Sequence, residues 1–167
     1  MTKRNLFTVF AVAAMTLTPT VFAADTSALN ISVGPEATFA SAFSATTLTA
    51  ADTKFGGFSG TTNFNYKIRT SQEGGTGSIT VQVTAFGTNG PSPSDLAYTC
   101  TAPSSGTPCS SSTTASTASA TSVVSFGADA HSSDSGDSGS VVWSLVDRPT
   151  VKTGSYSSTA TFTISAS

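Results

Sequence analysis

Apolar and polar side chains alternate one by one along much of this chain, and that period of two restricts it to β-structure. Such a period places one face of a strand on a core and the other face in water. No apolar period of 3.6 extends beyond about one turn, although the phenylalanines of residues 39–51 leave a short helix open there. The predicted strands are residues 29–33, 64–69, 79–85, 96–100, 122–126, 141–146 and 160–165.

Turn residues separate these runs and set the expected architecture. Glu73–Gly77 is glycine-rich and predicts a hairpin between residues 64–69 and 79–85. Serine, threonine and β-branched residues dominate, and only 10% of the residues are charged. These residue types disfavour helix and suit strands. Several short strands at this spacing predict an all-β fold, an antiparallel immunoglobulin-like β-sandwich.

The first 23 residues have the three parts of a cleaved signal peptide. Lys3 and Arg4 form a positive start, and an apolar stretch of about ten residues runs from Leu6 to Met15. Val21-Phe22-Ala23 then supplies the small residues that a signal peptidase requires. The apolar stretch is shorter than the roughly 20 residues of a membrane span. We therefore expect export, with no membrane span in the mature chain.

Residues 24–167 are then expected to form a single β-sandwich domain, by their length. Without Lys3 and Arg4, five basic and nine acidic side chains remain, a net charge of about −4. With no basic patch, nucleic acid is a poor partner. The sequence leaves open whether the exported protein stays in a periplasm or reaches the cell surface or medium.

Cys100 and Cys109 are the only cysteines. In an exported chain such a pair predicts a disulfide, since the spacing fits neither a redox C-x-x-C motif nor a zinc cluster. The bond would close a loop at the start of a Ser/Thr-rich stretch, about residues 101–121, which we interpret as a long exposed loop, with a weakly apolar edge strand as the alternative.

No group of residues predicts an enzyme. Gly136–Gly139 resembles the nucleophile segment of trypsin-like proteases, but His131 is the only histidine and lies seven residues before Ser138. Asp129, Asp134 and Asp137 share one Gly/Ser-rich segment that is a weak Ca²⁺ candidate, without the spacing of a calcium-binding loop. We expect no other cofactor.

Two aromatic features bear on ligand binding. Trp143, the only tryptophan, lies in the most apolar run and is expected in the core. Phe55 and Phe58 lie in a glycine-rich loop and are candidates for an exposed patch that binds carbohydrate or another ligand, or for anchors of that loop.

The end of the chain, Lys152 to Ile164, resembles the closing strand of secreted bacterial immunoglobulin-like sandwiches, in which a Gly-x-Tyr turn leads into a Thr-rich alternating strand. Spore coat protein U-like and fimbrial-type subunits end this way. The resemblance implies a surface protein. The residues agree with it, because Gly154 permits a tight turn and Phe162 and Ile164 can fill a core.

The favoured hypothesis is a non-enzymatic exported structural or surface subunit whose partners are copies of itself or other surface subunits. Leu29, Ile31 and Val33 would form a strand donated to a neighbour's sheet edge or the protein's own first strand, and the sequence does not separate these. The alternative function is an extracellular module that binds carbohydrate or another ligand.

Overall fold

The computed structural model describes residues 27–101 and 105–167. The predicted signal peptide, residues 1–23, lies outside the described residues. The chain divides into residues 1–32 and residues 33–167, and the fold described below is that of the second unit. It consists of ten strands and one short 3₁₀ helix within the described ranges. They are β1 (Glu36–Phe39), β2 (Thr49–Ala50), β3 (Phe58–Arg69), β4 (Gly77–Val83), η1 (Pro93–Asp95), β5 (Leu96–Thr101), β6 (Thr107–Pro108), β7 (Thr113–Thr114), β8 (Thr121–Phe126), β9 (Asp137–Leu145) and β10 (Ala160–Ala166).

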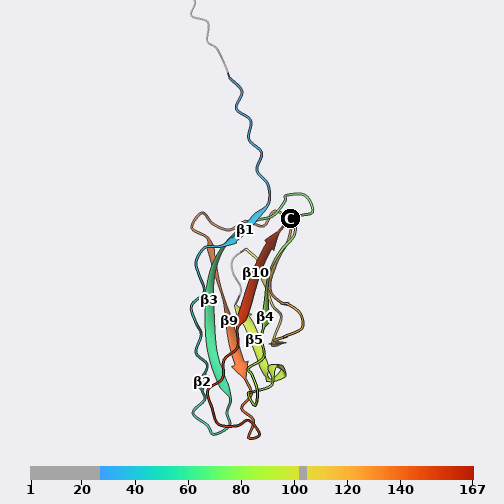
Figure 1. The fold of residues 1–167 in the computed structure, drawn as a ribbon. Coiled ribbons are helices and arrows are strands. Elements are labelled where there is room, and N and C mark those ends of the chain that lie inside the picture. The colour runs from blue at the N-terminus through green and yellow to red at the C-terminus, as the bar shows by residue number, and fades with distance from the viewer. Residues whose placement is uncertain (1–26, 102–104) are drawn as a thin grey trace, which may run out of the picture. The chain divides into compact units, whose positions relative to one another are not determined.

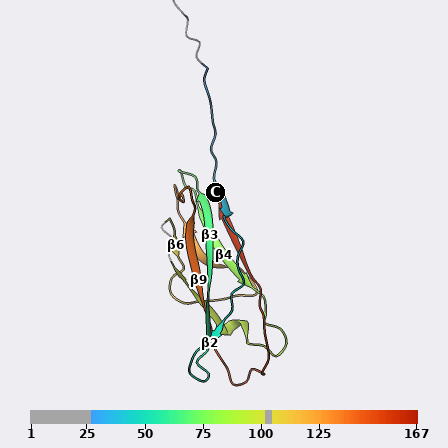
Figure 2. The same ribbon diagram turned by 90° about the vertical axis from the view of Figure 1, so that its left-hand side faces the viewer.

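The strands form two antiparallel sheets that pack face to face as a sandwich, which confirms the predicted fold class (Figures 1 and 2). The first sheet has the order β1-β3-β9-β5-β7, with β2 paired to the far end of β3. The second sheet has the order β10-β4-β8-β6. Each sheet therefore contains a central pair of strands, β3 with β9 in the first sheet and β4 with β8 in the second.

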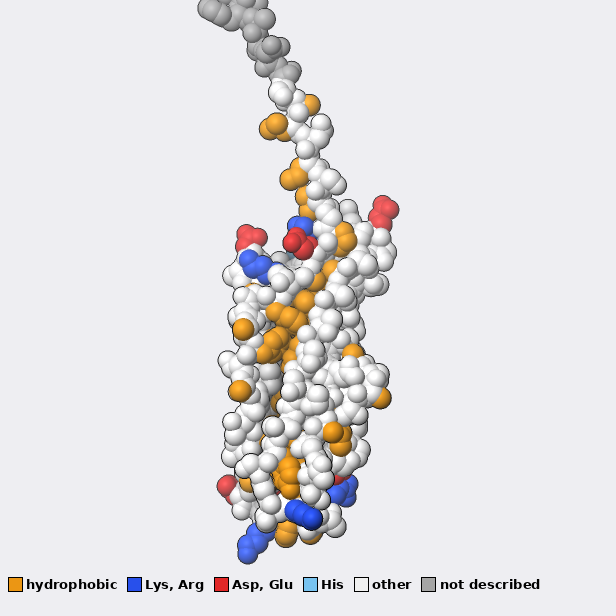
Figure 3. All heavy atoms as spheres, in the orientation of Figure 1, with side chains coloured by type: hydrophobic (Ala, Val, Ile, Leu, Met, Phe, Trp, Pro, Cys, Tyr) orange, Lys and Arg blue, Asp and Glu red, His pale blue; other side chains and the backbone are white. Residues whose placement is uncertain are grey.

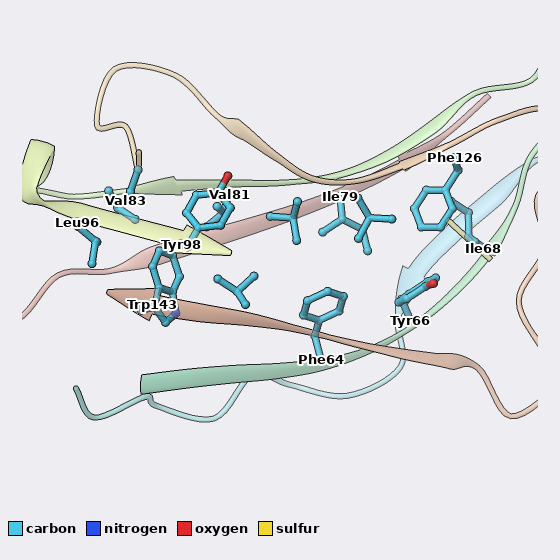
Figure 4. Close-up of a cluster of buried hydrophobic side chains, with 14 of the residues drawn as sticks. Phe64, Tyr66, Ile68, Ile79, Val81, Val83, Leu96, Tyr98, Phe126 and Trp143 are labelled. Carbon is cyan, nitrogen blue, oxygen red and sulfur yellow. The ribbon is translucent and has the colours of Figure 1, made fainter. Parts of the chain in front are cut away.

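Strict alternation of burial along these strands produces the core. In β3 every second side chain from Thr62 to Ile68 is buried and those between them are exposed. Residues from both sheets interdigitate in one cluster, in which Phe64 and Tyr66 face Ile79 and Phe126 (Figure 4). Trp143 is buried in this cluster, as predicted.

The expected hairpin at Glu73–Gly77 is wrong. β3 pairs with β1, β2 and β9, whereas β4 pairs with β8 and β10, so residues 70–76 carry the chain from one sheet to the other. Thr70 anchors this crossing, because its hydroxyl donates to the carbonyl of Gly127 at 2.7 Å and its amide donates to the carbonyl of Ala130. Glycines signal a turn without indicating which sheet receives the next strand.

Two other segments differ from the simplest expectation. Residues 39–51 contain no helix: Phe39 ends β1, and the chain then runs extended or irregular to β2. Residues 105–120, within the stretch interpreted as an exposed loop, are mostly irregular and contribute the two-residue edge strands β6 and β7. Residues 102–104 lie outside the described ranges.

The predicted disulfide between Cys100 and Cys109 is present. Cys100 lies in β5 of the first sheet, and Cys109 directly follows β6 of the second sheet, where its amide donates to the carbonyl of Val123. The bond therefore joins the two sheets along one lateral edge of the sandwich. The opposite lateral edge, formed by β1, β2 and β3 on one side and β10 on the other, has no such link among the described residues.

Candidate functional site

The lateral edge between β3 and β10 is open, and we call it the open edge. β10 is the terminal strand of its sheet and pairs only with β4 in the described chain. At the two ends of β10, the backbone carbonyl of Thr159 accepts from the amide of Thr84, and the amide of Ser167 donates to the carbonyl of Thr76. In an antiparallel ladder the residues that face a partner alternate. Residues 160, 162, 164 and 166 therefore direct their backbone groups away from β4, where β1 contacts β10 without pairing with it.

The same alternate residues carry an incompletely buried apolar row. Phe162, Ile164 and Ala166 point to the core but are only half-buried, as are Ala37 and Phe39 of the adjacent β1. Figure 3 shows the apolar side chains of this face as an oblique stripe along the β3 side of β10. An apolar row beside unpaired backbone groups is the surface that a further strand would cover.

Residues 40–48, which join β1 to β2, lie over this row without closing it. The backbone amide of Ala40 donates to the carbonyl of Asn65, but residues 41–48 form no backbone-to-backbone hydrogen bond with the described chain. Phe43 supplies the main contact, a stacked ring 4.5 Å from that of Phe162. Thr46 adds a hydroxyl contact of 2.6 Å with Thr62. Leu48 also packs against the core. Side-chain contacts, rather than backbone pairing, thus hold residues 41–48 in place.

A pocket of about 1030 Å³ opens where β10 begins, and we call it the apolar pocket. Both Phe55 and Phe58, the predicted ligand patch, line it, so the structure brings them together. Phe55 is 62% exposed and Phe58 is half-buried. The pocket also reaches the core, where Trp143 and Leu145 form part of its wall.

A smaller, mainly polar hollow of about 340 Å³ adjoins the apolar pocket. We call it the polar hollow. Asn89, Ser92 and Ser94 line it, and Arg148, Val151 and Lys152 line both cavities. Because these three residues are shared, the two cavities lie next to each other.

An ion pair stabilises the wall of the polar hollow. The Arg148 guanidinium donates from Nε to Asp95 Oδ2 at 2.7 Å and from Nη2 to Asp95 Oδ1 at 2.5 Å. These hydrogen bonds hold the pKa of the Asp95 carboxyl below its usual range, against the effect of its burial, and raise the pKa of Arg148. The positive charge of Arg148 is therefore already matched by a carboxylate within the protein.

A second polar cluster lies at the start of β9. Ser105 Oγ donates to Asp137 Oδ2 at 2.5 Å and is 3.1 Å from the Tyr66 hydroxyl. Burial raises the pKa of Tyr66, so it stays protonated. The His131 ring instead contacts the carbonyl of Asp129 at 2.9 Å.

The structure does not bring the weak calcium candidates into one cluster. Asp129 and Asp134 are exposed, while Asp137 also accepts from the amide of Ser133 at 3.2 Å. Within residues 27–101 and 105–167, no three His, Cys, Asp or Glu side chains are grouped so that they could hold a metal ion. Nor do these ranges contain a helix long and apolar enough to cross a membrane.

The candidate strand-addition residues lie outside every described strand. Leu29 and Ile31, in the first unit, are 95% and 89% exposed, and Val33, at the start of the second unit, is 59% exposed. The alternation of residues 29–33 is thus present in the sequence, without a paired strand. We call residues 28–33 the arm.

Sequence reasoning did not find the open edge or the apolar pocket. The pocket wall combines residues from distant parts of the chain, within residues 43–62, 83–96 and 143–162, which are close together only after the sheets pack. Phe43 offered a partial signal, because it interrupts a Ser/Thr/Ala stretch that otherwise has little to bury.

Comparison of the chain with protein-family models, with curated proteins and with solved structures gives no match.

Proposed function

We propose that this protein is a non-enzymatic, exported structural subunit that assembles by strand addition. The arm of one copy would pair with the open edge of the next. The single observation that carries this proposal is that one chain contains both an exposed, alternating apolar arm and an unpaired, half-covered apolar strand edge. Export is supported by the features of residues 1–23 and by the disulfide, which is typical of oxidising compartments.

The arm matches the open edge in length and in pattern. Its six residues span about 20 Å when extended, close to the length of the seven-residue β10. Leu29, Ile31 and Val33 would face the half-buried row of the groove, and Asn30 and Ser32 would face water. Backbone groups of the arm would pair with those of residues 160, 162, 164 and 166, which would satisfy both sets.

Burial of the arm supplies part of the free energy of assembly. Full burial of a Leu, Ile or Val side chain contributes about 1.5–3 kcal/mol, and three such residues are exposed in the arm. Ordering the arm costs about 1–2 kcal/mol per residue, which offsets most or all of that gain. The backbone hydrogen bonds and the Phe162 and Ile164 surfaces covered at the same time add to the favourable side.

The experiment measures mass in solution by light scattering after size-exclusion chromatography. Purified protein is expected to give multimers, and the double substitution Leu29→Asp plus Ile31→Asp is expected to give monomers that remain folded. The matched control is Asn30→Asp plus Ser32→Asp, which adds the same charge to the opposite face of the arm and is expected to leave most assembly intact.

Two results would contradict the proposal. If the unmodified protein is a monomer at all concentrations, the arm does not act between copies. If the Leu29/Ile31 variant loses its circular dichroism signal or its cooperative unfolding, the arm belongs to its own sheet rather than to a neighbour's.

A further inference from the structure

We infer that the apolar pocket and the polar hollow together bind a single-chain amphiphile with a carboxylate head, that is, a long-chain fatty acid. The hydrocarbon chain would occupy the apolar pocket, and the carboxylate would lie at Lys152, which lines both cavities. None of the residues involved belongs to the arm, but Ala160 and Phe162 line the apolar pocket and also belong to the open edge, so a bound ligand and an added arm would share this surface. Ligand binding is measured by fluorescence and assembly by mass in solution, so the failure of one is distinguishable from the failure of the other.

The inner wall of the apolar pocket suits hydrocarbon better than sugar. Its large apolar contributors are four phenylalanines, a tryptophan and three leucine or valine side chains that reach the core; among the described residues, these are Phe43, Phe58, Phe86, Phe162, Trp143, Val83, Leu96 and Leu145. The Trp143 indole N–H already donates to Thr62 Oγ1 at 2.8 Å. No fully buried side-chain nitrogen or oxygen of the described chain lacks a partner. A sugar hydroxyl placed against this inner wall would meet mainly apolar surface. The hydroxyls that line the pocket belong to its other walls, among them Ser44, Thr47, Thr153 and Ser157.

The volume also fits a long chain. Ligand cavities for small molecules span about 300–1,000 Å³, and the apolar pocket lies at the upper end of that range at about 1030 Å³. The adjoining polar hollow, lined by Asn89, Ser92 and Ser94, offers hydroxyl and amide groups to a head group.

Charge at the junction indicates the sign of the head group. Arg148 is committed to Asp95 by two hydrogen bonds. Lys152 is exposed, lines both cavities and has no ion pair within residues 27–101 and 105–167. Asp147 lines the apolar pocket but not the polar hollow. A carboxylate placed in the polar hollow would therefore meet one cation whose charge is available.

Phe55 supports a ligand at the pocket mouth. This residue has a left-handed backbone (φ 57°), which costs free energy for a bulky side chain. Its ring lines the apolar pocket and yet stays largely exposed. The free energy cost of this backbone conformation is offset when the ring covers an apolar ligand instead of facing water.

The single tryptophan makes binding directly measurable. Trp143 lines the pocket, so a stearate brominated at mid-chain would quench its fluorescence by contact. We expect saturable quenching at one ligand per protein, and weaker binding of the stearyl alcohol with the same bromines. Lys152→Gln is expected to weaken stearate binding about tenfold, the effect of losing one charge-assisted hydrogen bond, and to leave alcohol binding unchanged.

Lys54→Gln is the matched control, because Lys54 is an exposed lysine of the neighbouring loop that lines neither cavity. It should leave both affinities unchanged, and thermal unfolding should show that both variants are folded. Quenching that does not saturate would overturn the pocket as a ligand site. Saturable quenching that is equal for acid and alcohol, or unaffected by Lys152→Gln, would overturn the carboxylate assignment.

Discussion

Asp95 shows how one residue connects several elements. It ends η1, its side chain is 6% exposed, and its carbonyl accepts from the amide of Val146 just beyond β9. Both carboxylate oxygens are bound by Arg148. The pair therefore fixes the start of the 146–160 segment, which forms one wall of the apolar pocket.

We predict that this ion pair makes the free energy of unfolding fall at acidic pH. Hydrogen bonds from Arg148 lower the folded-state pKa of Asp95 below its ordinary value of 3.8. As the pH falls, the unfolded chain takes up the proton first, so the contribution is complete only above about pH 5. It is lost as the pH falls through 3.8 toward the folded-state pKa. Urea unfolding between pH 7 and pH 2.5 should show this loss. The Asp95→Asn variant should have a lower free energy of unfolding at pH 7, and that free energy should change less with pH.

Glu36 provides the comparison for that measurement. Its 3.4 Å pair with Arg69 is exposed on both sides, and exposed pairs contribute little. The free energy of unfolding of Glu36→Gln should therefore match that of the unmodified protein between pH 7 and pH 2.5. If the Glu36 and Asp95 variants behave alike, the Arg148 pair has no special role in stability.

A second prediction concerns Thr62, a buried hydroxyl in β3. It accepts from Trp143 Nε1 at 2.8 Å and lies 2.6 Å from Thr46 Oγ1. Thr62→Val keeps the shape but leaves the buried indole N–H without a partner, which should cost about 1–3 kcal/mol. Thr62→Ser keeps the hydroxyl and should cost less. Urea unfolding followed by tryptophan fluorescence measures both, and equal stability of the Val and Ser variants would contradict the prediction.

At the scale of elements, β10 has one paired and one unpaired edge, and proline can distinguish them. A proline removes one backbone N–H and is tolerated in a strand where that N–H has no partner. Ala160→Pro removes an N–H on the unpaired edge, so it should change the unfolding free energy by less than about 1 kcal/mol while weakening assembly. Chemical unfolding and light scattering measure the two effects separately.

Ser165→Pro is the opposite case in the same strand. Its N–H faces β4, where Ser165 is paired with Ser78, so its loss should destabilise the monomer by about 1–3 kcal/mol. Equal effects of the two prolines on the stability of the monomer would show that the two edges of β10 are not distinct.

The strands were more predictable from the sequence than their pairing. The alternating run of residues 64–69 lies within β3 and that of residues 79–85 overlaps β4, because burial of one face produces the alternation directly. The short strands β1 and β2 were not predicted, because two to four residues show too little alternation. Both are strands because they pair with β3. Alternation alone does not place a segment in a sheet, because residues 29–33 alternate as clearly as β4 but have no paired strand.

The candidate site was partly predictable for the same reason. Phe55 and Phe58 stood out because aromatic residues are conspicuous in a glycine-rich loop, and they do line the apolar pocket. Lys152 and Asn89 gave no signal, because their role depends on a loop arrangement that no local pattern encodes. The failed hairpin at Glu73–Gly77 has this cause as well, since a turn is a local property whereas sheet membership is not.

For the sandwich as a whole, the two lateral edges are unequal. The disulfide joins the sheets at one edge, whereas the open edge is covered by residues 40–48, whose strongest contact is Phe43. Glu36 lies opposite Arg69, and Ser71 donates to the carbonyl of Ser167. The chain therefore enters the sandwich at the end where β10 finishes, while the apolar pocket lies where β10 begins.

This polarity yields a prediction about how copies join, which rests on the proposed function. If each arm enters its neighbour from the pocket end, Val33 lies near Ala160 and Leu29 lies nearer the end of β10, antiparallel to it. Every copy then adds to the next in the same direction, and the contact is heterologous and forms an open filament. If two copies exchange arms at their entry ends, the arms run parallel to β10 and a closed dimer forms.

Paired cysteines on the outward face decide between these arrangements. Asn30→Cys or Ser32→Cys in the arm is combined with cysteine at Ser165, Thr163, Thr161 or Thr159, all exposed, and oxidised cross-links between copies are scored on denaturing gels. In the antiparallel arrangement the preferred β10 partner moves toward Thr159 as the arm position moves from 30 to 32, with 30 to 163 and 32 to 161 as the expected pairs. We expect that result together with filaments in negative-stain images. A shift in the opposite direction with a dimer would contradict the head-to-tail arrangement, because parallel pairing closes the assembly after two copies.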